Sequence, residues 1–250
     1  MSLSGQKIFA AGRFFGVANG TDPTPTVFAI PQDQSIGFKR SVKSLFGENQ
    51  LPADISSGTM EVTGKVSLGT LNPRMFADLL FAVTGANSQI LEANGELGTV
   101  STTHIVVANG ATFSTDLGVF NTVSGARYVR VAASSEVAGV SYSVNTATGS
   151  YRFNAADSGV VMKISYLYTA ASQGELLTLT NAQMGNIGSF TAVMQFNWAS
   201  EQSVLTLNKC LGTDTEIATK LDDYGKPTFG FMAGCDTNAT LGTFSFSEAA

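Results

Sequence analysis

Alternation of apolar and polar residues with a period of two is the feature that most constrains the fold of this sequence. In the stretch 59–68, Met60, Val62 and Val66 fall on one side of an extended chain, and polar residues fall on the other. Successive side chains of a β-strand point to opposite faces, so the pattern predicts a strand with one solvated face. The stretch 35–44 alternates in the same way, and we expect the two strands to pair.

A polar segment, Leu45 to Gly58, separates these two stretches and contains glycine, asparagine, proline and aspartate residues. A hairpin loop normally has about 2 to 5 residues, so this segment is too long for a simple turn. The sequence therefore predicts a long loop with a functional role.

One helix is predicted directly after the second strand. Asn72 is a suitable N-cap, and Pro73 fits the first turn, where a missing N–H costs nothing. Gly85 is the expected C-terminal stop. The helix should pack on a sheet through an apolar stripe formed by Met75, Phe76, Leu79, Leu80 and Val83.

The rest of the chain indicates short strands separated by turns. Residues 86–98 are small and polar and are expected to form a connection, whereas 104–168 has the pattern of a meander that could form a small sandwich of its own. Strands are predicted again from 176 to 247, and the phenylalanines of 228–232 and 241–247 would meet if these two strands pair. With 26 glycines, 17 phenylalanines and 13% charged residues, the chain is predicted to be mainly β, a β-sandwich or partial barrel with one short flanking α-helix.

Composition excludes several classes of protein. The 250 residues carry 14 Lys and Arg against 19 Asp and Glu, a net charge of −5, which argues against sequence-specific binding of nucleic acid. No stretch approaches the roughly 20 apolar residues of a membrane helix, and the first eleven residues lack a signal-peptide pattern, so we expect no membrane and no export. Cys210 and Cys235 are expected to be free, reduced thiols.

Chemistry-bearing residues do not form a recognisable active site. The single histidine, His104, starts an apolar run and lacks a nucleophile motif nearby, so a structural role is favoured. The acidic group around Asp214 and Asp223 lacks the glycine and the closing glutamate of a calcium loop. Phosphate-binding and dinucleotide motifs are absent from the sequence, as is cysteine spacing suited to zinc. We therefore expect no enzyme activity, no cofactor and no metal.

Charge is distributed unevenly along the chain. Five basic residues between positions 39 and 74 outweigh three acidic ones, whereas acidic residues dominate from 201 to 250. A subunit with a basic and an acidic patch can meet copies of itself head to tail, and charges scattered on a soluble surface are an equally good interpretation.

Three segments resemble the tail tube (major tail) proteins of long-tailed bacteriophages and related prophages. The first runs from a strand through an aromatic-Gly-Glu-Asn-Gln-x-Pro loop and a T-G-K strand to a short helix, and reads SIGFKRSVKSLFGENQLPADISSGTMEVTGKVSLGTLNPRMFADLLF. The other two read GSYRFNAADSGVVMKISYLYTA and DDYGKPTFGFMAGCDTNATLGTFSFSE. Together they cover about a third of the chain, although each motif alone consists of common turn and strand residues.

The resemblance implies a virion structural protein, assembled in the host cytoplasm, whose copies form rings, typically of six. Sheets of neighbouring subunits would join into a continuous ring, and stacked rings would form a hollow tail tube through which DNA passes without specific binding. Further partners implied by the family are the tail tip, terminator and tape-measure proteins. The residues implied to contact the next ring are Phe46, Gly47, Glu48, Asn49, Gln50, Leu51 and Pro52.

The same resemblance implies a tube-forming core of residues 1–100 and 173–250, with 101–172 as a β-rich insertion or an elaboration of that core. The alternative function is a monomeric β-sandwich that binds carbohydrate or acts in adhesion. Its aromatic side chains could stack on sugars, and the candidates are Tyr128, Tyr142, Tyr151 and Trp198.

Overall fold

A computed structural model describes residues 12–19, 24–28, 30–181, 183–185, 188–198 and 201–246. The chain forms two compact units, which we call unit 1 (Met1–Thr84 with Leu177–Ala250) and unit 2 (Gly85–Leu176). The strands of unit 1 are β1 (Arg13–Ala18), β2 (Thr26–Phe28), β3 (Pro31–Phe46), β4 (Pro52–Leu68), β12 (Phe190–Trp198), β13 (Glu201–Glu216), β14 (Thr228–Gly234) and β15 (Gly242–Ser245). Those of unit 2 are β5 (Ala86–Thr99), β6 (His104–Val106), β7 (Phe113–Asn121), β8 (Arg127–Arg130), β9 (Ser141–Asn145), β10 (Ser150–Phe153) and β11 (Val161–Leu176).

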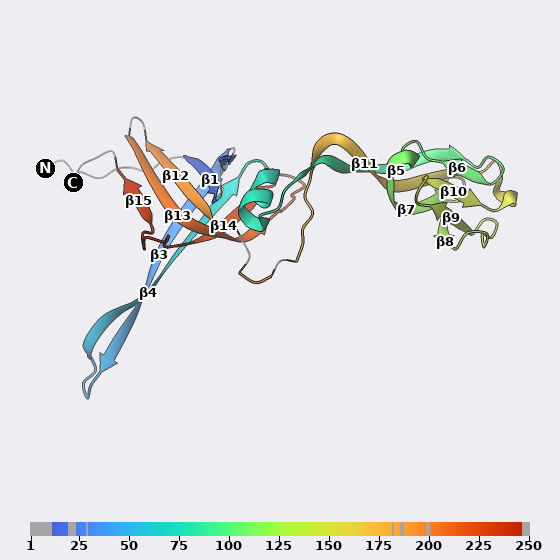
Figure 1. The fold of residues 1–250 in the computed structure, drawn as a ribbon. Helices are drawn as coiled ribbons and strands as arrows, with labels where there is room; N and C mark the ends of the chain where they lie inside the picture. Colours follow the sequence, from blue (N-terminus) through green and yellow to red (C-terminus); the bar gives the residue numbers. More distant parts are fainter. Residues whose placement is uncertain are drawn as a thin grey trace. The chain divides into compact units, whose positions relative to one another are not determined.

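Unit 1 is built on one eight-stranded sheet with the order β2-β1-β12-β13-β14-β4-β3, and β15 also pairs with β13 (Figure 1). All of its pairings are antiparallel. The sheet curls into a half-barrel, so the prediction of a mainly β chain with a sandwich or partial barrel is confirmed.

Strands β3 and β4 pair along almost their whole length, which confirms the pairing predicted from the alternating stretches. The predicted long loop, Leu45 to Gly58, is wrong, because both strands continue through it and leave only residues 47–51 as the turn. Strand β14 pairs with β4 only from Val62 to Ser67, so the remainder of β3 and β4 extends beyond the sheet as a two-stranded arm (Figure 1).

The core of unit 1 is rich in phenylalanine. Phe14 and Phe28 meet edge to face with ring centroids 4.6 Å apart, and Phe229 and Phe231 pack in the same cluster. The last two strands do not pair with each other, because β14 and β15 each pair with β13. Phe244, on β15, is consequently exposed and contacts Phe196.

The predicted helix is present but short. It is the π-helical segment η1 (Met75–Phe81), preceded by one turn in which the Asn72 side chain accepts a hydrogen bond from the Arg74 N–H at 3.0 Å. It ends at Ala82, which adopts a left-handed conformation, and not at Gly85. Met75 and Leu79 are buried against the sheet, where Gly16 leaves room for the Leu79 side chain. No helix in the described part of the chain is long and apolar enough to cross a membrane.

Unit 2 is a seven-stranded arrangement with the order β5-β11-β7-β8-β9-β10-β6 and two single 3₁₀ turns, η2 (Gly110–Thr112) and η3 (Ala155–Asp157). Every pairing is antiparallel except that of β8 with β9. The predicted connection at 86–98 is wrong, since these residues form β5 and pair with β11. Unit 2 therefore begins at Gly85 and ends at Leu176, whereas the sequence placed the insertion at 101–172.

Candidate functional site

The arm formed by β3 and β4 has two chemically different faces. Val42 pairs with Ser57, and Ser44 pairs with Ile55, so alternate residues of both strands share a face. A bulge at Gly58 and Thr59, opposite Ser41, adds one residue to β4, so that Ile55 lies on the same face as Met60. The face that results, here called the apolar arm face, carries Phe38, Val42, Ile55 and Met60, together with one cation, Arg40, whose Nη2 lies 3.9 Å from the Met60 sulfur. The opposite face carries Lys39, Lys43, Asp54 and Glu61.

The apolar arm face continues the core of unit 1 outward. Phe38 pairs with Val62, which is only 3% exposed and belongs to the core. Beyond that point the cover ends: Phe38 and Met60 are 47% and 49% exposed, and Val42 and Ile55 are each 61% exposed. Four exposed apolar side chains grouped on one face of a strand pair, with a single arginine among them, are typical of a surface that another protein covers.

Strand β3 is also an edge of the sheet. Its 16 residues pair with β4 on one side, and no described strand pairs with the other side. A long unpaired edge offers a row of backbone N–H and C=O groups to another chain, and proteins usually shorten or block such edges. Here the edge carries cationic side chains at Lys39, Arg40 and Lys43, but it is neither short nor covered.

The residues predicted to contact a neighbouring ring lie together at the tip of the arm. Phe46 is the last residue of β3, Pro52 is the first of β4, and Gly47 to Leu51 form the turn. Phe46 and Leu51 are 63% and 79% exposed, and the turn borders an open hollow of about 610 Å³. Sequence reasoning missed Ile55 on the apolar arm face, because the bulge at Gly58 interrupts the alternation that would have revealed it.

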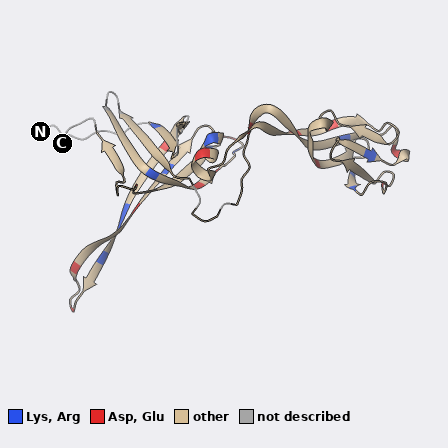
Figure 2. Cartoon of the chain, viewed as in Figure 1, with Lys and Arg blue, Asp and Glu red and all other residues tan. Residues whose placement is uncertain are grey.

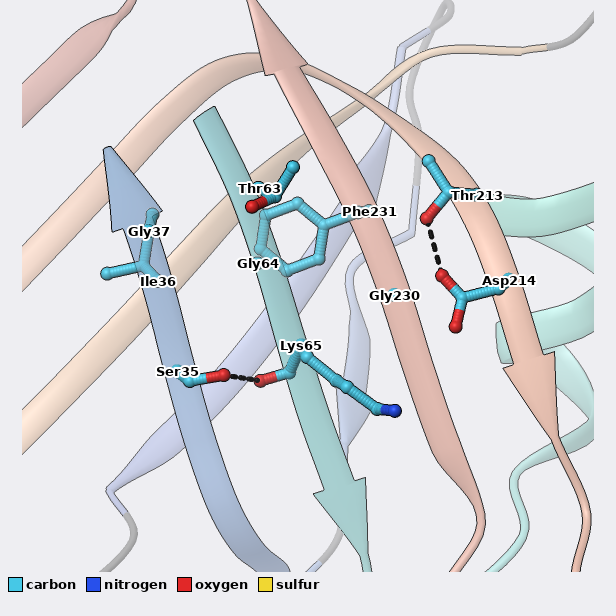
Figure 3. Close-up of a pocket in the computed structure, with 10 residues that line it drawn as sticks. All are labelled: Ser35, Ile36, Gly37, Thr63, Gly64, Lys65, Thr213, Asp214, Gly230 and Phe231. Carbon is cyan, nitrogen blue, oxygen red and sulfur yellow. Dashed lines mark hydrogen bonds between the residues drawn. The ribbon is translucent and has the colours of Figure 1, made fainter. Parts of the chain in front are cut away.

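A second hollow, of about 440 Å³, spans β3, β4, β14 and β13 (Figure 3). Glycines at 37, 64 and 230 account for much of its lining. Two of its hydroxyls are engaged locally: that of Ser35 donates to the Lys65 carbonyl at 3.4 Å, and that of Thr213 donates to Asp214 Oδ1 at 2.7 Å (Figure 3).

Unit 2 holds a set of buried tyrosines that donate to carboxylates. Asp116 accepts hydrogen bonds from the hydroxyls of Tyr142 at 2.6 Å and Tyr151 at 3.0 Å, and Tyr166 donates to Glu96 at 2.6 Å. Burial, followed by the nearby Asp116 carboxylate, raises the pKa of Tyr142 and of Tyr151 well above the usual value. These tyrosines are therefore neutral hydrogen-bond donors, as expected of residues that stabilise the fold.

The bulge that aims Asp116 into this network depends on Gly118. Leu117 is the extra residue of β7 at this point and is 44% exposed, whereas the Asp116 side chain is 4% exposed. Gly118 has φ +124°, a conformation that side chains disfavour, and its N–H donates to Asp116 Oδ1 at 3.0 Å.

The aromatic side chains proposed for sugar stacking are mostly unsuited to it. Tyr128, Tyr142 and Tyr151 are between 0% and 3% exposed and lie in the core of unit 2, so their ring faces are covered. The side chain of Trp198 lies outside the described part of the structure.

Other candidate residues are separate from one another. His104 is exposed on β6, with the Thr103 hydroxyl 2.7 Å from Nδ1. Cys210 is buried and Cys235 is exposed, and both are free; burial raises the pKa of the Cys210 thiol to about 12. Asp214 and Asp223 do not converge on a metal site, and the described residues contain no group of three potential metal ligands.

Charged side chains are sparse over both units (Figure 2). Lys39 and Lys43 lie on the charged face of the arm and Lys65 on the neighbouring part of β4, while Asp214 and Glu216 lie on β13. Both signs thus occur within unit 1, with the basic residues concentrated on β3 and β4. No protein-family model matches the sequence, and no curated protein matches it.

Proposed function

We propose that this chain is a structural subunit that assembles with copies of itself, and specifically that it builds the hollow tail tube of a long-tailed bacteriophage. The observation that carries the proposal is the β3–β4 arm, whose apolar face is uncovered in the single chain. The proposal assigns that face, with the arm tip Phe46 to Pro52, to contacts with neighbouring copies in adjacent rings.

The exposed area supports a macromolecular partner. Fully burying a large apolar side chain contributes about 1.5 to 3 kcal/mol, and the four side chains of the apolar arm face are about half to two thirds exposed. Covering them would thus contribute about 3 to 6 kcal/mol per arm. An exposed strip of this size is a solubility cost for a protein that remains monomeric, and a copy of the same chain is the partner present at the highest local concentration.

The free edge of β3 supports the same conclusion by a separate route. Pairing with an edge strand of a neighbouring copy would satisfy its outward N–H and C=O groups and would continue the curled sheet around a ring. A half-barrel with an unpaired edge is a suitable element for such a ring.

The tail tube role rests on the sequence resemblance and on charge. In this role the subunit binds itself and the tail tip, terminator and tape-measure proteins, and it performs no catalysis. A net charge of −5 suits a conduit for DNA. Affinity for DNA comes largely from counterions released when cationic side chains contact phosphates, so a tube with few such contacts would not retain the DNA.

A shortened arm tests the proposal. Arg40 and Met60 face each other across the hairpin, so replacing residues 41–59 by Asn-Gly closes a two-residue turn while β4 keeps its pairing with β14. We expect a folded subunit, with a β-type circular dichroism spectrum and a cooperative thermal transition, that forms no stacked rings in electron micrographs. Normal tubes from this variant would refute the role of the arm.

A further inference from the structure

The cationic side chains of unit 2 are all exposed, whereas most of its carboxylates are covered. Residues 85–176 contain six acidic and four basic residues, yet only Glu92 and Glu175 of the acidic ones are exposed. The others turn inward, with side-chain exposures of 4% for Asp116 and 5% for Glu136. All four basic residues are exposed: Arg127, Arg130, Arg152 and Lys163.

Two of these cations border a hollow of about 430 Å³ between β7, β8 and β9. Its lining includes Arg127 and Arg130, with Asp116, Tyr128 and Tyr142. No carboxylate lies within 4 Å of Arg127 in unit 2, all of whose residues are described. Arg127 and Arg130 thus both line a space that is large enough for a small molecule.

The Asp116 carboxylate leaves the Arg130 guanidinium available for a ligand. Asp116 Oδ1 accepts hydrogen bonds from the Tyr151 hydroxyl and the Gly118 N–H. Asp116 Oδ2 accepts a hydrogen bond from the Tyr142 hydroxyl at 2.6 Å. Oδ2 is 3.9 Å from Arg130 Nη1, which is beyond hydrogen-bonding distance. The Arg130 side chain is 50% exposed. The Arg130 guanidinium therefore donates no hydrogen bond of normal length to the protein.

We propose that this hollow binds an acidic sugar residue, that is, a sugar ring that carries a carboxylate or phosphate group. Arginine recognises both groups through paired N–H donors, and two arginines at one rim supply the attraction. Leu117 and Val129, which are 44% and 59% exposed, give the hollow an apolar wall for the ring. Nucleic acid is disfavoured, since two cations above a buried carboxylate neutralise too few phosphates to hold a polyanion.

This inference concerns unit 2 alone and does not rest on the proposed assembly. It also differs from sugar stacking on Tyr128, Tyr142 or Tyr151, because those rings are buried and recognition would depend on the guanidinium groups. Ligand-observed saturation-transfer NMR is a suitable assay, because it works for both monomers and large assemblies of the full chain.

Glucuronic acid, glucose 1-phosphate and glucose are the three probes. We expect saturable binding of one or both acidic sugars and none of glucose; the acid that binds identifies the anionic group. Arg127→Gln and Arg130→Gln should each weaken this binding at least tenfold. Lys163→Gln removes the same charge from an exposed site outside the hollow and should change the affinity less than twofold.

Three results would overturn the assignment. They are failure of both acidic sugars to bind, binding of glucose with equal affinity, and a loss of affinity in Lys163→Gln as large as that in the arginine variants. The last result would show that the general positive charge of unit 2, and not the hollow, attracts the probe.

Discussion

Replacing Val42 and Ile55 by serine should weaken self-association without unfolding the subunit. Each side chain is 61% exposed in the single chain, and full burial contributes about 1.5 to 3 kcal/mol, so covering the exposed share contributes about 1 to 2 kcal/mol per residue. The double variant should thus lose about 2 to 4 kcal/mol per subunit contact, which raises the concentration needed for assembly roughly 30- to 700-fold.

The assay is sedimentation velocity across a concentration series, with the thermal unfolding midpoint as the check on folding. Leu45→Ser is the matched control, because Leu45 is 65% exposed on the same arm but pairs with Asp54 on the charged face. We expect the control to assemble within a fewfold of the unmodified concentration. The reasoning is refuted if the double variant assembles at the unmodified concentration, or if the control loses assembly to the same extent.

Three further predictions concern the buried groups. Asp116→Ala should lower the stability of unit 2 by about 2 to 6 kcal/mol in denaturant unfolding, because it leaves the buried hydroxyls of Tyr142 and Tyr151 without an acceptor; a loss below 1 kcal/mol would contradict this. Because the pKa values of these tyrosines are raised in the folded state, their contribution to the free energy of unfolding is complete below pH 10 and is lost as the pH rises above 10. Absorbance at 295 nm should therefore show their ionisation only together with unfolding. A thiol reagent should modify Cys235 in the native protein and Cys210 only after unfolding, and rapid modification of both would show that β13 is not packed as described.

Local patterns predicted the strands whose alternation is regular. The stretches 35–44 and 59–68 are paired as expected, because the buried face at Val62 and Val66 imposes the period of two. The segment between them looked like a loop because it is rich in glycine, asparagine, proline and aspartate and because the bulge at Gly58 interrupts the alternation. An exposed arm has no buried side to enforce alternation, so sequence periodicity is weakest there.

Which strands pair when they are far apart in the chain could not be predicted from the sequence. Strand β13 pairs with β12, β14 and β15, and the choice of these partners depends on the curl of the whole sheet. The hollow of unit 2 could not be predicted from the sequence either. A bulge in β7 turns Asp116 inward, and strand β8 places Arg127 and Arg130 at the hollow. The tip residues Phe46 to Pro52 were singled out by the family resemblance, and the structure places them together at the turn between β3 and β4.

The particle formed by the purified, unmodified chain tests the central claim most directly. Analytical ultracentrifugation followed by electron microscopy should show rings and stacked tubes whose amount grows with protein concentration. A strict 26.1 kDa monomer at the highest concentrations reached would contradict the account, because the apolar arm face and the free edge of β3 would then remain uncovered.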